Sequence, residues 1–250
     1  MDLSPAQSTD IGMYHLYQDL ARWWPLLSPV EEYAEEARFF LAVFEERKLP
    51  ITAALLELGA GGGHNAFHMK SRFAEVVLTD QSAAMLAASR TLNPDCKHFQ
   101  GEMRTLNLGR TFDAVFVHDA VDYMCTRNDL AALLRNVAKH CRSGGWALLV
   151  PDHTAETFTP ATEHGGSDAE GRSIRYLEWS HDPDPADEMI TVDYVYVMRE
   201  KGGPPSVIHE SHHCGLFSST VWTAELQNAG FHPEMVSDPF GREIFIARRE

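Results

Sequence analysis

Short apolar runs alternate with amphipathic segments through the middle of the chain. The runs of strand length are 54–58, 75–79, 113–117 and 146–150. Helical spacing marks 82–90, 128–142 and about 219–229, and two further strands are expected at 234–237 and 243–248. This alternation predicts parallel strands joined by right-handed crossovers. We therefore expect an α/β fold built on a Rossmann-like, seven-stranded, doubly wound sheet.

The segment before this core has the spacing of two N-terminal helices. One is expected over about Tyr14 to Trp24. The second begins at Ser28, which can cap it while Glu31 completes a capping box, and it ends at Pro50. Both helices precede the first strand of the sheet.

After Pro151 the alternation stops. Three stretches separated by proline- and glycine-rich turns predict an antiparallel meander, and they are 174–181, 189–199 and 207–217. The chain is therefore divided into N-terminal helices with the core, an antiparallel β insertion over the carboxyl edge of the sheet, and a final helix with strands that complete the core. These parts are 1–159, 160–217 and 218–250.

A glycine-rich loop follows the first predicted strand, with glycines at 59, 61, 62 and 63. Glycines at alternate positions let the backbone turn tightly and approach a ligand closely. Such a loop alone leaves nicotinamide and flavin enzymes open as alternatives. Glu57, two residues before the first glycine, favours S-adenosylmethionine (SAM), because an acid there balances an ammonium group and would repel a pyrophosphate.

Other residues after the predicted strands agree with SAM. Asp80 ends the second strand, where a carboxylate can accept both ribose hydroxyls. Glu102 and Met103 stand where they could frame an adenine, and the turn at 142–145 leads tightly into the strand at 146–150.

With these motifs, residues 54–150 resemble the class I SAM-dependent methyltransferases. The resemblance implies SAM as methyl donor and S-adenosylhomocysteine (SAH) as product, with His118 near the methionine portion. The cofactor-binding residues that it implies are Tyr14, Trp24, Glu57, Gly59, Ala60, Gly61, Gly63, Asn65, Asp80, Gln81, Met85, Glu102, Met103, His118, Asp119 and Tyr123.

More narrowly, the chain is similar to small-molecule N-methyltransferases that act on nucleotide-linked amino sugars. The shared stretches are a tyrosine-rich N-terminal helix, the tetrapeptide 101–104, Glu156-Thr157-Phe158, and the run from His213 to Phe217. The segment His118 to Tyr123 replaces a serine-rich run of that group.

Charge and composition restrict the partners. The formal net charge of −15 disfavours nucleic acid, since it repels phosphate backbones. No apolar run approaches the ~20 residues of a membrane helix, and the first ten residues lack a signal pattern. The four cysteines lack pair spacing and suit reduced thiols. We expect a cytoplasmic protein with a small-molecule substrate, without a nucleic-acid or membrane partner, and possibly a homodimer.

Three histidines are candidates for a general base, namely His118, His153 and His213. Each could accept a proton near neutral pH. A metal site at 209–214 is not expected, because strand alternation places His209 and His213 on one face and His212 and Cys214 on the other.

The favoured function is methyl transfer to a nitrogen or oxygen of a small molecule. The alternatives are a SAM-binding sensor or partner subunit without catalysis, and a nicotinamide oxidoreductase. We expect the β insertion to select the substrate, with Tyr176 and Trp179 on opposite faces, and we expect Trp23, Trp24, Tyr176 and Trp179 to give the pocket an apolar lining. The insertion could also be a dimer surface.

Overall fold

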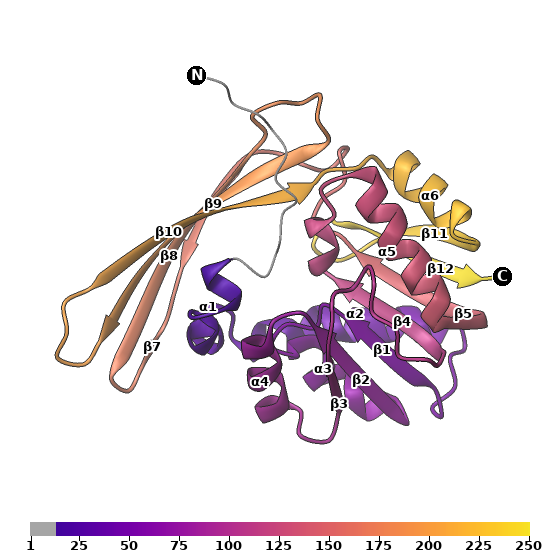
Figure 1. The fold of residues 1–250 in the computed structure, drawn as a ribbon, viewed down its shortest axis with the longest axis horizontal. Helices are drawn as coiled ribbons and strands as arrows, with labels where there is room; N and C mark the ends of the chain where they lie inside the picture. The colour runs from indigo at the N-terminus through magenta and orange to yellow at the C-terminus, as the bar shows by residue number, and fades with distance from the viewer. Residues whose placement is uncertain (1–13) are drawn as a thin grey trace.

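The computed structural model describes residues 14–250, and it confirms the expected α/β fold (Figure 1). A seven-stranded sheet has the order β11-β12-β5-β4-β1-β2-β3. Its strands are β1 (Ala54–Leu58), β2 (Glu75–Asp80), β3 (Lys97–Gln100), β4 (Phe112–His118), β5 (Cys141–Val150), β11 (Phe231–Ser237) and β12 (Glu243–Arg249). The first five run parallel, and β12 pairs antiparallel with β5 and β11. All parallel strands therefore present their carboxyl ends at one edge.

The strand β3 was not predicted. It forms the edge of the sheet and pairs only with β2. None of its residues is buried, so no apolar run marks it in the sequence.

Helices cover both faces of this sheet. One face packs against α5 (Arg127–His140) and α6 (Ser219–Asn228), and the other against α2 (Ala34–Glu46) and α3 (His64–Met69). α3 continues into the short helix η5 (Lys70–Arg72), and α4 (Ala83–Leu92) packs beside β2 and β3. The hydroxyls of Ser82, Thr126 and Ser218 cap α4, α5 and α6. These caps fix where the helices start, directly after the strand ends that carry the site.

The expected helix from Tyr14 to Trp24 is wrong. Two 3₁₀ turns, η2 (His15–Tyr17) and η3 (Ala21–Trp23), and the single turn α1 (Trp24–Leu27) replace it. The segment packs on several sides at once, since Leu16, Leu20 and Trp23 enter a core that they share with the second sheet. A regular helix has one apolar stripe and could not make all these contacts.

The expected cap at Ser28 is also wrong. Its hydroxyl bonds the phenol of Tyr33 at 2.7 Å. A further 3₁₀ turn, η4 (Val30–Tyr33), starts after Pro29 without a side-chain cap and leads into α2. The chain thus reaches α2 through short turns that lie close to the edge of the main sheet.

The second sheet has the order β10-β9-β8-β6 and is antiparallel. Its strands are β6 (Ala161–Gly165), β8 (Arg172–His181), β9 (Met189–Glu200) and β10 (Ser206–Gly215), with the two-residue strand β7 (Asp168–Ala169) paired to β8. The three long strands match the predicted meander, whereas β6 and β7 were not foreseen. In Figure 1 this sheet extends to the left of the core, with α1 against β8.

Candidate active site

One cavity of about 730 Å³ lies where the carboxyl ends of β1, β2 and β4 face the inner side of the second sheet. Ligands of open α/β sheets bind at this edge. Thirteen of the sixteen predicted cofactor residues line it: Trp24, Glu57, Gly59, Ala60, Gly61, Asn65, Asp80, Gln81, Met85, Met103, His118, Asp119 and Tyr123. Tyr14, Gly63 and Glu102 do not.

The glycines of the loop differ in what surrounds them. All three of Gly59, Gly61 and Gly63 have positive φ, at 68°, 52° and 76°. A Cβ on Gly61 would meet only the Met85 methyl at 3.4 Å, so this glycine faces the cavity. A Cβ on Gly63 would collide with Ser89 and Asn93, side chains of the neighbouring α4 region. Gly63 therefore serves packing at the start of α3 and does not face a ligand.

Two carboxylates stand at the cofactor end of the cavity. Glu57 is only 3% exposed, its Oε2 has no hydrogen-bond partner, and burial raises its pKa to about 8. Asp80 accepts hydrogen bonds from the backbone N–H groups of Gly61 and Ser82 at 2.9 and 2.7 Å, and burial raises its pKa. A buried acid without a cation suits the ammonium group of SAM, and the carboxylate at the end of β2 suits its ribose hydroxyls.

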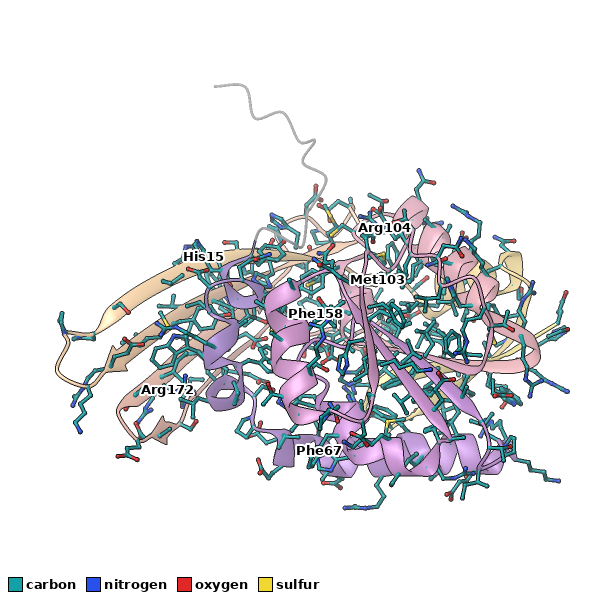
Figure 2. All side chains as sticks on the ribbon, turned by 60° about the horizontal axis from the view of Figure 1, so that its bottom comes forward. His15, Phe67, Met103, Arg104, Phe158 and Arg172 are labelled. Atoms are coloured by element: carbon teal, nitrogen blue, oxygen red, sulfur yellow. The ribbon has the colours of Figure 1, made fainter. Side chains whose placement is uncertain are left out.

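The prediction for Glu102 as an adenine contact is not supported by its position. Its carboxylate accepts from Arg104 Nε at 2.8 Å, and Arg104 also pairs with Asp129 (Met103 and Arg104 are labelled in Figure 2). This ion pair turns Glu102 away, whereas Met103 and Met85 remain as apolar walls of the cavity.

His118 lies in a charged cluster at the end of β4. Its Nε2 is 3.1 Å from Glu36 Oε2, and its Nδ1 is 3.0 Å from Asp119 Oδ1. Burial alone would lower its pKa, but the two carboxylates outweigh burial and raise it to about 10. A pKa this high favours the protonated imidazolium at neutral pH, which argues against the predicted role of His118 as general base. As a cation it suits the carboxylate of SAM.

The other two histidines occupy different environments. His153 lines the cavity, and burial and Arg242 lower its pKa, so it is neutral at pH 7 and can accept a proton. His213 is exposed on the outer face of β10 and does not line the cavity, which contradicts its candidacy as a base. Strand alternation instead directs His212 inward, where it is 1% exposed.

A chain of hydrogen bonds connects the N-terminal segment to β10. The hydroxyls of Tyr17 and Tyr123 are 2.6 Å apart, and Tyr123 Oη is 2.8 Å from His212 Nδ1. The chain ends at His212; Glu210 Oε1 lies 3.2 Å from His212 Nε2 as an ion-pair contact, and Glu210 accepts from the backbone N–H of His15 (labelled in Figure 2) at 2.7 Å. Glu210 and His212 were missed, although their parity on β10 directs both inward.

Tyr14 and Trp24 lie on this N-terminal segment. Tyr14 stacks on His212 with ring centroids 3.8 Å apart, so it supports the segment and does not contact the cavity. Trp24 lines the cavity, and its indole N–H donates to His64 Nδ1 at 3.0 Å. We name residues 14–27 the N-terminal lid, because Tyr17 and Trp24 line the cavity from its other side.

Acidic residues occupy the rest of the cavity, and sequence reasoning missed Asp122, Glu163 and Glu178 among them. The carboxylates away from the cofactor loop belong to Asp119, Asp122, Asp152, Glu163 and Glu178. Burial and Asp119 raise the pKa of Asp152 to about 8, and burial and Glu163 raise that of Glu178 to about 7. Glu178 shares the inward parity of Tyr176, which was the signal available in the sequence.

The aromatic residues divide between inside and outside. Tyr176, Tyr194 and Trp24 line the cavity, whereas Trp179 is 50% exposed on the outer face of the sheet and Trp23 is buried in the core. The predicted opposition of Tyr176 and Trp179 is confirmed, and the expected contribution of Trp23 and Trp179 to the pocket is wrong. Within residues 14–250, no group of acids, histidines and cysteines could hold a metal, and no helix could span a membrane.

Comparison with known proteins follows the same lines. A family model described as a methyltransferase domain matches residues 55–145. The chain is 30% identical over 220 residues to a dTDP-3-amino-3,6-dideoxy-alpha-D-glucopyranose N,N-dimethyltransferase of Streptomyces fradiae, which covers 86% of this chain and 84% of that relative. It is 27% identical to a dTDP-3-amino-3,4,6-trideoxy-alpha-D-glucopyranose N,N-dimethyltransferase of Streptomyces venezuelae over 86% of this chain and 91% of the relative.

Two solved structures are also similar. One is SAM-bound CalS10, an amino pentose methyltransferase from Micromonospora echinaspora, with a TM-score of 0.76 and 25% identity over 87% of this chain and 92% of that one. The other, the sugar N-methyltransferase KedS8 from Streptoalloteichus, shares the fold with a TM-score of 0.82 and 24% identity over 100% of this chain and 98% of that one.

Proposed function

Because this chain belongs to the family of SAM-dependent methyltransferases, we propose that it methylates the amino nitrogen of a small molecule, specifically an amino sugar. SAM is the methyl donor and SAH the product. The family assignment removes the non-catalytic sensor and the nicotinamide oxidoreductase as alternatives. Two relatives named above are amino-sugar N,N-dimethyltransferases, which supports nitrogen as the acceptor.

The observation that carries the proposal is the charge of the cavity. Five acidic residues line its part away from the cofactor loop: Asp119, Asp122, Asp152, Glu163 and Glu178. Among the described lining residues, Arg242 is the sole lysine or arginine. The raised pKa values of Asp152 and Glu178 return toward normal when a cation binds beside them, so the site favours a protonated amine, whereas a neutral hydroxyl gains little from these acids.

The cofactor end fits SAM. Glu57 would hold its ammonium group, protonated His118 its carboxylate, and Asp80 its ribose hydroxyls, while Gly61 leaves room beside the loop. SAM supplies an electrophilic methyl group, so the protein has mainly to align the nucleophile with it.

Proton removal is the remaining chemical task, because an ammonium group has no lone pair with which to attack. His153, which lines the cavity and is neutral at pH 7, can accept this proton, whereas the pKa of about 8 leaves Asp152 largely protonated. The amine nitrogen then forms its bond to the methyl carbon as the carbon–sulfur bond breaks. The carboxylates around the methylated nitrogen stabilise its positive charge.

The test is a methyl-transfer assay with matched acceptors, followed by mass spectrometry. An amino sugar and the same sugar with a hydroxyl in place of the amine are supplied with SAM. We expect methylation of the amine only, and Glu178→Gln should raise KM for the amine about tenfold by removing one attracting charge. Glu170→Gln, at an exposed position between β7 and β8, is the control. Equal methylation of the hydroxyl compound would contradict the proposal.

A further inference from the structure

The charge balance of the cavity also bears on what the amino sugar is attached to. The relatives named above act on dTDP-linked sugars, whose diphosphate carries about two negative charges near neutral pH. We infer that this enzyme instead takes an amino sugar that is not linked to a nucleoside diphosphate, with a remainder that is uncharged or basic. The inference rests on the proposed amine methylation and names its substrate class.

Arg242 is the sole lysine or arginine among the described lining residues that could pair with a diphosphate, and carboxylates already surround it. Its guanidinium donates to Asp238 at 2.6 Å and to Glu36 at 2.9 Å. Asp119 and Asp152 each lie 3.8 Å from its Nη1. Even with Asp152 protonated, as its pKa of about 8 implies at pH 7, three carboxylates face the guanidinium and the protonated His118 beside it, so Arg242 offers a phosphate no net attraction.

The described lining residues include no lysine and no second arginine, and residues 1–13 contain neither residue type in their sequence. His118 is paired with Glu36 and Asp119, and the low pKa of His153 leaves it neutral. A diphosphate in this cavity would therefore face uncompensated acids.

The opposite wall has the same sign. Glu178 and Glu163 lie on β8 and β6, and their strands pair so that the two residues stand directly across from each other. Like charges opposite one another destabilise a sheet unless a cation relieves them. Burial and Glu163 raise the pKa of Glu178 to about 7, and on the facing wall burial and Asp119 raise that of Asp152 to about 8, so a cation bound between them would favour the ionised form of both. Both walls are thus complementary to a basic ligand.

Asp119 and Asp152 are accordingly the residues that set this preference. They stand on the loops after β4 and β5, on the cavity side of Arg242. Replacing both with asparagine removes two acidic groups beside the guanidinium while preserving side-chain shape. Glu36 and Asp238 remain, so the negative charge around Arg242 decreases without reversing, and the site should bind phosphate groups more tightly than the native protein does.

The first measurement is the binding of dTDP to the SAH-loaded protein by calorimetry, which requires no turnover. We expect no binding at about 1 mM dTDP to the native protein, and at least about tenfold tighter binding to the double variant Asp119→Asn/Asp152→Asn. Asp184→Asn, on the exposed turn between β8 and β9, is the matched control and should behave as native protein. Far-UV circular dichroism and thermal unfolding report whether each variant is folded.

The second measurement compares two acceptors that carry the same amino sugar, its methyl glycoside and its dTDP-linked form. We expect kcat/KM for the native enzyme to be at least about tenfold higher with the glycoside. A native Kd for dTDP in the micromolar range, or preference for the dTDP-linked sugar, would overturn the inference while leaving amine methylation intact. If neither acceptor is methylated although dTDP is rejected, amine methylation itself is the part that fails.

Discussion

At the scale of single residues, two glycines of the glycine-rich loop have different roles that the sequence does not distinguish. Gly61 and Gly63 both have positive φ, so alanine at either site costs about 1 kcal/mol in backbone strain. They differ in surroundings, because a side chain on Gly61 enters the cavity and one on Gly63 strikes Ser89 and Asn93.

This difference gives opposite phenotypes for two matched variants. Gly61→Val should raise the Kd for SAH at least about tenfold and leave a folded protein, because its side chain occupies ligand space. Gly63→Ala should bind SAH nearly normally once folded but lose about 2–3 kcal/mol of unfolding free energy through overpacking. Calorimetry and urea unfolding measure the two effects. Normal SAH binding by Gly61→Val would remove the loop from the cofactor site.

Asp80 offers a second test at this scale. Asparagine keeps its shape and one acceptor oxygen but loses the charge toward the ribose hydroxyls. We expect Asp80→Asn to weaken SAH binding by about 1–3 kcal/mol. Asp95→Asn, an exposed acid paired with Lys70, should leave the affinity unchanged. If both variants bind SAH equally, Asp80 does not contact the ribose.

At the scale of secondary-structure elements, the hydrophobic pattern predicted those strands whose formation depends on neighbouring residues in the sequence. The buried parallel strands carry continuous apolar runs, and the strands of the meander lie between proline and glycine turns. The N-terminal lid was mispredicted because distant groups determine it: Glu210 accepts from the backbone N–H groups of His15 and Leu16, 195 and 194 residues away. No local spacing encodes such a contact.

Among the site residues, too, those placed by local pattern were predicted and those placed by distant contacts were not. Parity along β10 predicts that His212 and His213 lie on opposite faces, but which face turns inward depends on how the whole sheet packs. Glu36 was likewise missed as a partner of His118, since it belongs to a helix 82 residues earlier. Cofactor residues at strand ends were found because topology alone brings strand ends together.

The second sheet supplies a prediction about specificity. Tyr176 faces the cavity, while Trp179 and His213 are exposed on the outer face. Tyr176→Ala should raise KM for the acceptor about tenfold or more, because it deletes a wall of the pocket, and should leave SAH affinity near native. Trp179→Ala and His213→Ala are the controls and should leave both constants unchanged. An unaffected KM in Tyr176→Ala would assign specificity to the N-terminal lid instead.

At the scale of the whole molecule, the acidic cavity makes stability depend on pH. Glu57 has a folded pKa of about 8, above its unfolded value near 4.3. The unfolded state therefore releases its proton first, so the stabilising contribution is complete below about pH 4 and is lost as pH rises toward 8. The unliganded enzyme should become less stable over this range.

Glu57→Gln isolates this effect. The variant and native protein should be equally stable near pH 4, and the variant should gain about 2–4 kcal/mol by pH 8. The same variant should bind SAM more weakly, because the ammonium group loses its counter-charge. Thermal unfolding from pH 4 to 9, without and with SAH, measures both. Parallel stability curves would mean that Glu57 titrates normally.

The hydrogen bonds that hold the N-terminal lid in place bear on the turnover rate of the enzyme. Tyr17 and Trp24 cover one side of the cavity, and the lid is tied to β10 through Glu210 and to α4 through the Ser82 hydroxyl. We expect these bonds to break before SAH leaves and fresh SAM enters. Each catalytic cycle would then contain one lid-opening step that does not depend on the acceptor. Rapid-quench kinetics should record a burst of one SAH per enzyme molecule, followed by a slower steady state set by lid opening.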